Sequence, residues 1–230
     1  MDILEAMGLQ RLRWDQLAQN RTRRFLVCLC VDASASMSID GRMDTVNSEL
    51  RNFLKKENRD SYVRDALELC LVSFGNGAQV KLQFGSLEEA AQADLTIQPT
   101  GSLSALGAGV RAALEQLDSR MKTLEGEKIA CYRPLLILIS DGEATDKRLC
   151  AELGREIRDR IRAETLHVNC LSFGGQSEGA GVLAQFTIDG KVAPVDRLRV
   201  MDFFDMLSRS LSQFSRQSLR RGELELSGGF

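Results

Sequence analysis

The sequence lacks the features of several protein classes. It has a single histidine and three prolines among 230 residues, and its six cysteines form no C-x-x-C pair, so no cluster of histidines and cysteines competes for a metal. Its longest apolar runs, Phe25 to Val31 and Leu135 to Ile139, fall far short of the roughly 18 residues that span a bilayer. The first residues also lack the basic segment and apolar core of a signal peptide. We therefore expect a cytoplasmic protein with reduced cysteines.

An excess of charge of either sign is also missing. The 30 Lys and Arg residues face 32 Asp and Glu residues, which leaves a net charge of -2. Because nucleic-acid-binding proteins usually carry a clear basic excess, no nucleic acid partner is expected. The content of 43% hydrophobic and 27% charged residues is typical of a soluble globular protein.

Apolar runs of strand length alternate with segments of helical periodicity. Buried strands separated by amphipathic helices predict an α/β fold, with a doubly wound (Rossmann-like), mostly parallel sheet that has one antiparallel edge strand. The turn Gly75-Asn-Gly77 predicts the hairpin that supplies this edge strand. We expect strands near 25–31, 66–74, 78–84, 134–140, 165–173 and 192, helices near 43–54, 87–93, 104–121, 147–164, 179–186 and 203–214, and a polar connection at 122–133.

The predicted organisation is one domain at 24–218 with a short extension at each end. Residues 1–23 could form an amphipathic helix, and residues 11–24 carry an excess of four positive charges. We expect this helix to pack on the domain; the alternative is docking on a partner or an anionic surface. The tail, 219–230, is either a frayed end or a short partner-binding strand.

Two of the predicted strands run into an aspartate. Asp32 follows the first strand and Asp141 follows the fourth, at the sheet edge where open α/β sheets bind ligands. Ser34 and Ser36 alternate after Asp32 and could face one point, and the segment 102–104 supplies a third hydroxyl. Two carboxylates and three hydroxyls form an all-oxygen site, which suits Mg²⁺ or Mn²⁺.

Three motifs of the sequence resemble those of the von Willebrand factor A domain with its metal-ion-dependent adhesion site. Asp32-Ala-Ser-Ala-Ser36 resembles the family's D-x-S-x-S, and Asp141-Gly-Glu-Ala-Thr-Asp146 resembles its D-G-x-x-T-D. The segment Ser104-Ala-Leu-Gly-Ala-Gly-Val110 is similar to T-x-L-G-x-x-L, with serine in place of threonine. The resemblance spans about residues 24–218. The segment 203–212 is similar to the end of the bacterial tellurium-resistance-associated (TerY-like) group.

This resemblance implies a metal held directly or through water by Asp32, Ser34, Ser36, Ser104 and Asp141. Ser102-Leu103 replaces the family's paired glycines, so Ser102 and Thr100 are alternatives for the third hydroxyl. A carboxylate from a partner protein would complete the coordination of the cation. The implied function is a non-enzymatic, Mg²⁺-dependent protein-interaction module. Its implied setting is a bacterial stress, tellurium-resistance or phage-defence system linked to a protein kinase and a PP2C-type phosphatase.

Two other functions are alternatives to this one. A phosphohydrolase of the haloacid-dehalogenase type also has an aspartate after its first strand, but it needs a second one where this chain has Ser34. A scaffold that needs no metal is the other alternative. Glu143 and Asp146 could be catalytic acids, but we expect them to line the rim of the site or, in the case of Asp146, to cap the helix 147–164. His167 opens an apolar strand and is expected to be packed or capped rather than a ligand.

Overall fold

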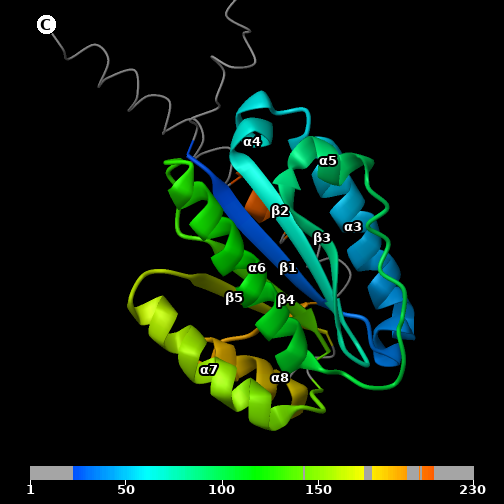
Figure 1. The fold of residues 1–230 in the computed structure, drawn as a ribbon. Helices are drawn as coiled ribbons and strands as arrows, with labels where there is room; N and C mark the ends of the chain where they lie inside the picture. Colours follow the sequence, from blue (N-terminus) through cyan, green and yellow to red (C-terminus); the bar gives the residue numbers. More distant parts are fainter. Residues whose placement is uncertain (1–22, 142, 174–177, 196–201, 203, 210–230) are drawn as a thin grey trace, which may run out of the picture.

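A six-stranded sheet forms the centre of the molecule in the computed structural model, which describes residues 23–141, 143–173, 178–195, 202 and 204–209 (Figure 1). The strand order is β3-β2-β1-β4-β5-β6. The β2–β3 hairpin is antiparallel and every other neighbouring pair is parallel, so the predicted fold class is confirmed. The strands are β1 (Phe25–Asp32), β2 (Leu67–Phe74), β3 (Ala78–Ser86), β4 (Leu135–Ser140), β5 (His167–Phe173) and β6 (Ala193–Val195).

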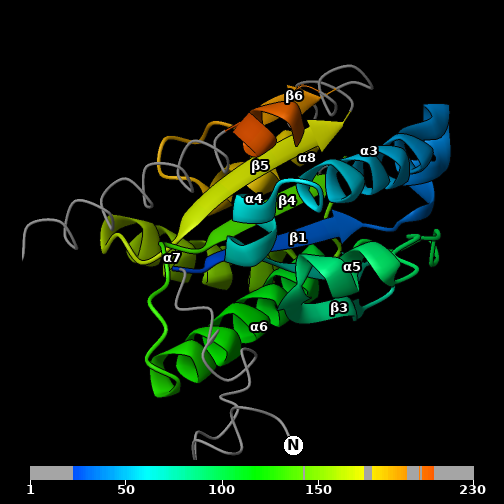
Figure 2. The same cartoon turned by 90° about the horizontal axis from the view of Figure 1, so that it is seen from above.

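Helices cover both faces of this sheet. Figure 2 shows α3 on one side of β1 and α6 on the other. The core is accordingly divided in two: α3, α4, α5 and residues 204–207 pack on one face, and α6, α7, α8 and η2 pack on the other. The helices are α3 (Arg42–Glu57), α4 (Ser61–Ala66), α5 (Leu87–Gln92), α6 (Leu106–Gly126), α7 (Lys147–Arg162) and α8 (Glu178–Leu183), with 3-10 turns η1 (Ala35–Gly41) and η2 (Ala184–Phe186).

The central strands are apolar at nearly every position because each face is buried. Along β1, Val27, Leu29 and Val31 contact one layer, and Leu26, Cys28 and Cys30 contact the other. Five of the six cysteines are buried and Cys131 is half-buried. Burial raises the pKa of the Cys170 thiol to about 12, so this side chain behaves as an apolar group at neutral pH.

The structure differs from the expected elements in two places. The short helix α4 was not predicted, and α6 continues to Gly126, so the polar connection expected at 122–133 is wrong over its first residues. Leu124 explains the longer helix, because it lies seven residues after Leu117 on the same face and is 1% exposed. The extension up to residue 22, the tail 219–230 and the last predicted helical turn at 210–214 lie outside the described residues.

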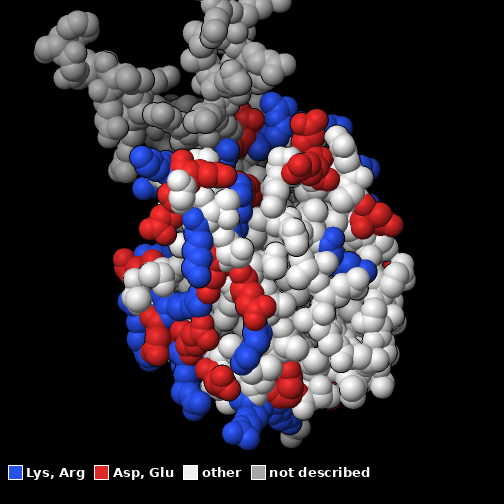
Figure 3. All heavy atoms as spheres, in the orientation of Figure 1, with Lys and Arg blue, Asp and Glu red and all other residues white. Residues whose placement is uncertain are grey.

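The surface is charged unevenly. In Figure 3 acidic and basic spheres alternate over α6 and α7, whereas the face over β2 and β3 is mostly uncharged. Ion pairs such as Arg160–Asp118 (2.6 Å) and Arg111–Glu152 (3.4 Å) join these two helices. Exposed pairs of this kind contribute roughly 0–1 kcal/mol each, so they favour solubility more than stability. Among the described residues, no helix is both long enough and apolar enough to cross a membrane.

Candidate metal centre

The two aspartates lie side by side at one edge of the sheet. β1 and β4 are parallel neighbours in which Val31 is opposite Ile139, so the strand that ends in Asp32 and the strand that leads to Asp141 finish together. Asp32 is completely buried and Asp141 is 8% exposed. The carboxyl ends of β1 and β4 therefore bring two carboxylates into a place with little access to water.

Backbone hydrogen bonds fix the loop that follows Asp32. The Ala33 N–H donates to Phe74 O (2.6 Å), and its carbonyl accepts from the Thr100 N–H (2.7 Å). The Ala35 N–H donates to Gly101 O (2.8 Å). Gly101 has a φ of 111°, and a Cβ there would lie 2.3 Å from the side chain of Asn76, so only glycine fits at this contact. The loop is held between the end of β2 and the segment before α6.

The Asp32 carboxylate is the centre of a hydrogen-bonded cluster. Its Oδ1 accepts from the Ser34 N–H (2.8 Å), and its Oδ2 accepts from the hydroxyls of Ser104 (3.1 Å) and Ser140 (2.6 Å). The hydroxyl oxygens of Ser34 and Ser36 are 2.9 Å apart. The structure thus brings together four of the five residues that the sequence singled out, and Asp141 follows Ser140 directly.

Of the three candidates for the third hydroxyl, Ser104 is the one that contacts Asp32. It is 5% exposed, whereas Ser102 and Thr100 are exposed. Its carbonyl oxygen accepts two hydrogen bonds from Thr145, one from the N–H (2.8 Å) and one from the hydroxyl (3.0 Å). Thr145 belongs to the segment after β4, so the loops before α6 and after β4 hold Ser104 in place.

Asp141 has an unusual environment for a buried carboxylate. Its Oδ1 is buried and has no hydrogen-bond partner among the described residues, and its Oδ2 lies 3.8 Å from Nη1 of Arg42. A buried carboxylate oxygen without a partner is costly, because the oxygen has lost its water without a replacement. Such an atom in a native fold calls for an explanation, and a bound ion is one.

The electrostatics of the pair also favour a cation. Burial raises the pKa of Asp32, while hydrogen bonds from Ser140 and Ser34 act to lower it. The negative charge of Asp141 acts in the same direction as burial. A divalent cation placed between the two carboxylates would relieve both effects.

The residues present fit a hard cation. In the part of the chain that the structure describes, no three Asp, Glu, His or Cys side chains gather into a possible metal site. The donors at this edge are two carboxylates and neutral hydroxyls, an all-oxygen set that Mg²⁺ prefers over softer metals. Oδ1 of Asp141, which has no hydrogen-bond partner among the described residues, is an atom of this set that could bind such a cation.

Three residues of the centre were missed in the sequence: Ser140, Thr145 and Arg42. Ser140 had a usable signal, because it ends an apolar strand one residue before Asp141. The interactions of Thr145 and Arg42 depend on how loops from different strands meet, which no local pattern reveals.

Two expectations about neighbouring residues were wrong. Asp146 does not cap α7 with its side chain; its carboxylate accepts from the N–H groups of Gly107 (3.0 Å) and Ala108 (2.9 Å), in the first turn of α6. This is a cap supplied across space, because α6 begins beside the segment after β4. His167 is exposed rather than packed at the start of β5, and partial burial together with the charge of Arg133 lowers its pKa. Glu143 is exposed.

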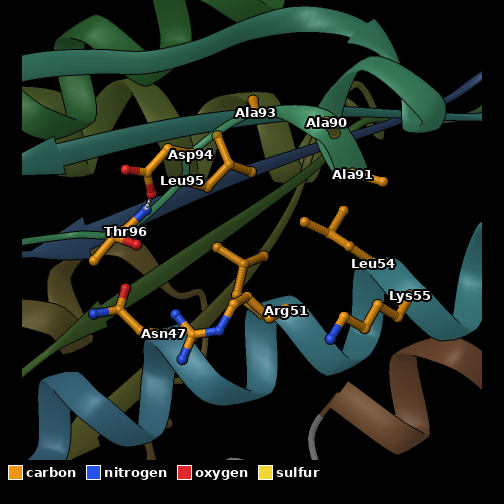
Figure 4. A pocket seen from close by; sticks show the side chains of 11 residues that line it. Asn47, Arg51, Leu54, Lys55, Ala90, Ala91, Ala93, Asp94, Leu95 and Thr96 are labelled. Carbon is orange, nitrogen blue, oxygen red and sulfur yellow. Dashed lines mark hydrogen bonds between the residues drawn. The ribbon is translucent and has the colours of Figure 1, made fainter.

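Two grooves of the surface lie away from the candidate metal ligands. Figure 4 shows a groove between α3 and the segment 90–96, of about 130 Å³, with Arg51 and Lys55 on one wall and Asp94 on the other. A larger hollow of about 840 Å³ lies beside β5 and the segment 187–193. No candidate metal ligand lines either of these two grooves.

Comparison with known proteins identifies the family. Residues 27–143, about half of the chain, match the von Willebrand factor type A domain, and the chain belongs to this family. Domains of this family are typically modules for protein interaction and adhesion.

Individual relatives are distant. Calcium-activated chloride channel regulator 1 of Mus musculus is 28% identical over 135 residues, which are 57% of this chain and 13% of that protein. A von Willebrand factor type A structure from Catenulispora acidiphila has a TM-score of 0.58 at 18% identity, covering 81% of this chain and 42% of that one. The corresponding domain of the type V pili tip protein Mfa5 from Porphyromonas gingivalis has a TM-score of 0.61 at 12% identity, covering 83% and 96%. These identities show a shared fold.

Proposed function

We propose that this protein is a non-enzymatic interaction module that binds a protein partner through Mg²⁺ (or Mn²⁺) at the edge of its sheet. The observation that carries the proposal is the buried Oδ1 of Asp141, which has no hydrogen-bond partner in the described part of the chain and lies beside the Asp32 cluster. The von Willebrand factor type A fold supports an interaction role. We also propose a cytoplasmic, TerY-like role in a bacterial stress, tellurium-resistance or phage-defence system, with a protein kinase or PP2C-type phosphatase among its partners, on the motif resemblance alone.

Each residue of the centre has a separate task in this proposal. Asp32 and Asp141 would neutralise the cation, and the hydroxyls of Ser34, Ser36 and Ser104 would add neutral oxygens. When bound, the cation supplies an open coordination position for a carboxylate of the partner. Ser140 holds Asp32 through its hydroxyl and Thr145 holds the backbone of Ser104, so the protein keeps the ligands in place.

The alternative of a phosphohydrolase has less support. That chemistry uses an aspartate nucleophile and a second carboxylate two residues later as the acid and base, and here that position is Ser34. Asp32 accepts three hydrogen bonds and is completely buried, which is a poor situation for a nucleophile. Turnover of a phosphate ester by wild type but not by Asp32→Asn would revive this alternative.

The proposal is tested by affinity capture from a lysate, followed by mass spectrometry. The arms are wild type with Mg²⁺, wild type with EDTA, Asp32→Ala with Mg²⁺ and Asp159→Ala with Mg²⁺. Asp159 is a matched control because its side chain is 75% exposed on α7, away from the sheet edge. We expect a partner that is retained by wild type and Asp159→Ala in Mg²⁺ and lost in the other two arms.

The same variants report whether the loss is specific. Asp32→Ala should keep its circular dichroism spectrum, since the β1 strand below it is held by core packing. A partner retained in all four arms would contradict metal-dependent binding and favour a scaffold that uses another surface. If the spectrum of Asp32→Ala collapses, the polar cluster has a structural role instead.

A further inference from the structure

Arg42 is a cation built into the edge of the candidate metal centre. Among the described residues it is the one basic side chain within 4 Å of either carboxylate of the site, with Nη1 3.8 Å from Oδ2 of Asp141. Its side chain is 20% exposed, so solvent screens this pair only in part. The second oxygen of Asp141 has no hydrogen-bond partner within the described ranges, so Arg42 compensates the carboxylate incompletely.

The position of Arg42 is unfavourable for helix formation. It is the first residue of α3, where the helix dipole disfavours a positive charge. The chain reaches this point through two successive residues of left-handed conformation, Asp40 (φ 53°) and Gly41 (φ 66°). Non-glycine residues adopt this conformation rarely, and it carries a cost where it occurs. The local backbone therefore places an arginine beside Asp141 although the helix dipole disfavours its charge and the left-handed conformation of Asp40 carries a cost.

Charge at the site follows directly from these groups. Asp32 and Asp141 with Arg42 leave one net negative charge in the metal-free protein when both carboxyls are ionised. A divalent cation would turn this into one net positive charge, which a single carboxylate of a partner would neutralise. Without Arg42, the loaded site would already be neutral and would have no excess charge for an anion.

We propose that Arg42 sets the charge of the centre, so that it weakens the binding of the metal alone and couples metal binding to the binding of an anionic, carboxylate-bearing partner. This inference rests on the proposed function and names the chemistry that the loaded site selects. Coupling of this kind is reciprocal: an anion that binds the loaded site raises the affinity for the metal by the same factor as the metal raises the affinity for the anion.

The experiment is a titration of the full chain with Mg²⁺ by isothermal calorimetry, in sodium chloride and in sodium acetate of equal ionic strength. The variants are Arg42→Gln, Arg42→Lys and Arg51→Gln. Arg51 is the matched control because it is an exposed arginine of the same helix and lines the groove of Figure 4 instead of the metal centre. Arg42→Met, which keeps the aliphatic stem, replaces Arg42→Gln if that variant does not fold.

We expect Arg42→Gln to bind Mg²⁺ about tenfold more tightly than wild type in chloride, from the loss of one like charge close to the metal. Arg42→Lys and Arg51→Gln should stay near the wild-type affinity. Acetate should tighten Mg²⁺ binding by wild type more than by Arg42→Gln. Loss of Arg42 should therefore strengthen Mg²⁺ binding and reduce the effect of acetate. A purely structural role of Arg42 would not change these two quantities in opposite directions.

Each outcome decides for or against the role of Arg42, the metal dependence of the natural protein, or both. Equal or weaker Mg²⁺ binding by Arg42→Gln, or an equal acetate effect in both proteins, overturns the role of Arg42 while metal binding by wild type stands. Binding by Arg42→Gln without measurable binding by wild type supports the role of Arg42 and contradicts metal dependence of the natural protein. Absence of binding in both proteins overturns both.

Discussion

The two ends of the sheet treat buried charge in opposite ways. At the amino ends of the strands, Glu68 of β2 is held by both Arg120, through two hydrogen bonds of 2.5 and 2.8 Å, and Arg24, at 3.3 Å. At the carboxyl ends, the two buried carboxylates have one arginine beside them, Arg42, which lies 3.8 Å from Oδ2 of Asp141; among the described residues Oδ1 of Asp141 has no hydrogen-bond partner. Both ends are equally well covered: Glu68 is 5% exposed and Asp141 is 8% exposed.

We interpret this difference as the one between a structural ion pair and the proposed binding site. A buried carboxylate that serves the fold is neutralised and its oxygens are bonded, as Glu68 shows. In the Asp32–Asp141 centre, Arg42 neutralises only part of the negative charge, although neighbouring hydroxyls donate hydrogen bonds. A fold retains such a cost where a ligand outside the protein removes it. If this interpretation holds, charge at the amino ends of the strands serves stability, and charge at their carboxyl ends serves binding.

The largest expected effect is on metal binding, from the change Asp32→Asn. The amide keeps the size of the side chain and an acceptor for the Ser34 N–H, and its NH₂ group can donate to the hydroxyl oxygens of Ser104 and Ser140. Because burial raises the pKa of Asp32, loss of its charge should leave the metal-free protein at least as stable as wild type at neutral pH. Loss of a direct ligand should weaken Mg²⁺ binding more than the roughly 10–100-fold that outer contacts contribute.

The measurement is thermal unfolding with and without Mg²⁺. Asp40→Asn is the control, since Asp40 is an exposed aspartate of η1 and asparagine tolerates its left-handed backbone. A metal-free Asp32→Asn protein that unfolds well below wild type would contradict the idea that this charge costs stability.

At the amino ends of the strands, Glu68→Gln should lower the stability of the protein and leave metal binding unchanged. The amide cannot pair with two guanidinium groups, so Arg24 and Arg120 lose their counter-charge. We expect a loss of about 2 kcal/mol in the free energy of unfolding, less than for a fully buried pair because Arg120 is 26% exposed. Urea denaturation measures it, and Mg²⁺ affinity should not change.

Glu164→Gln is the matched control for that change. Glu164 pairs with Arg133 at 3.0 Å, but its side chain is 76% exposed. Its loss should cost less than about 1 kcal/mol. Equal losses for the two variants would show that the Glu68 cluster has no special role in stability.

A smaller effect on binding distinguishes the third hydroxyl. Ser104→Ala removes a hydroxyl that is 3.1 Å from Oδ2 of Asp32, whereas Ser102→Ala removes an exposed one. We expect Mg²⁺ affinity to fall about tenfold for Ser104→Ala and to stay unchanged for Ser102→Ala, as for the loss of a positioned neutral ligand. Calorimetry decides the order, and the reverse order would assign the third ligand to Ser102.

The sequence was most informative where a pattern is local. Strands such as β1 and β4 are continuous apolar runs because both faces are covered, and the Gly75-Asn-Gly77 turn specified the antiparallel edge. The short α4 has too few turns to show a period. The end of α6 was set by Leu124, a single apolar residue in a polar stretch, which gives no clear period by itself.

The candidate centre divides in the same way. Asp32, Ser34, Ser36 and Asp141 follow strands, so their position could be derived from strand order alone. The roles of Ser140, Arg42 and Asp146 depend on contacts between segments far apart in the chain, 108, 99 and 39 residues from their partners Asp32, Asp141 and Gly107. Local periodicity contains no information on such pairs, and Asp146 was therefore assigned to the wrong helix.

The smallest predicted effect concerns Glu57, a buried carboxylate that lies between these two cases. It ends α3, is 2% exposed, and has a hydrogen bond with Ser208, and no described arginine forms an ion pair with it. Burial raises its pKa above the usual glutamate range, more than Ser208 and Lys56 lower it. A raised pKa in the folded state means that the folded protein binds the proton more tightly than the unfolded chain. Wild type therefore loses stability as the pH rises from about 4.3, the ordinary glutamate pKa, through the raised value.

Glu57→Gln should remove this pH dependence. Below pH 4 the variant and wild type should have similar free energies of unfolding, since the carboxyl is then protonated in both states. At neutral pH the variant should be the more stable, and urea denaturation across this range measures the difference. Glu115→Gln, an exposed change in α6, should show no such trend. A Glu57→Gln protein that is less stable than wild type at neutral pH would place Glu57 with Glu68, as a charge that the fold needs, rather than with Asp32, as a charge that it only tolerates.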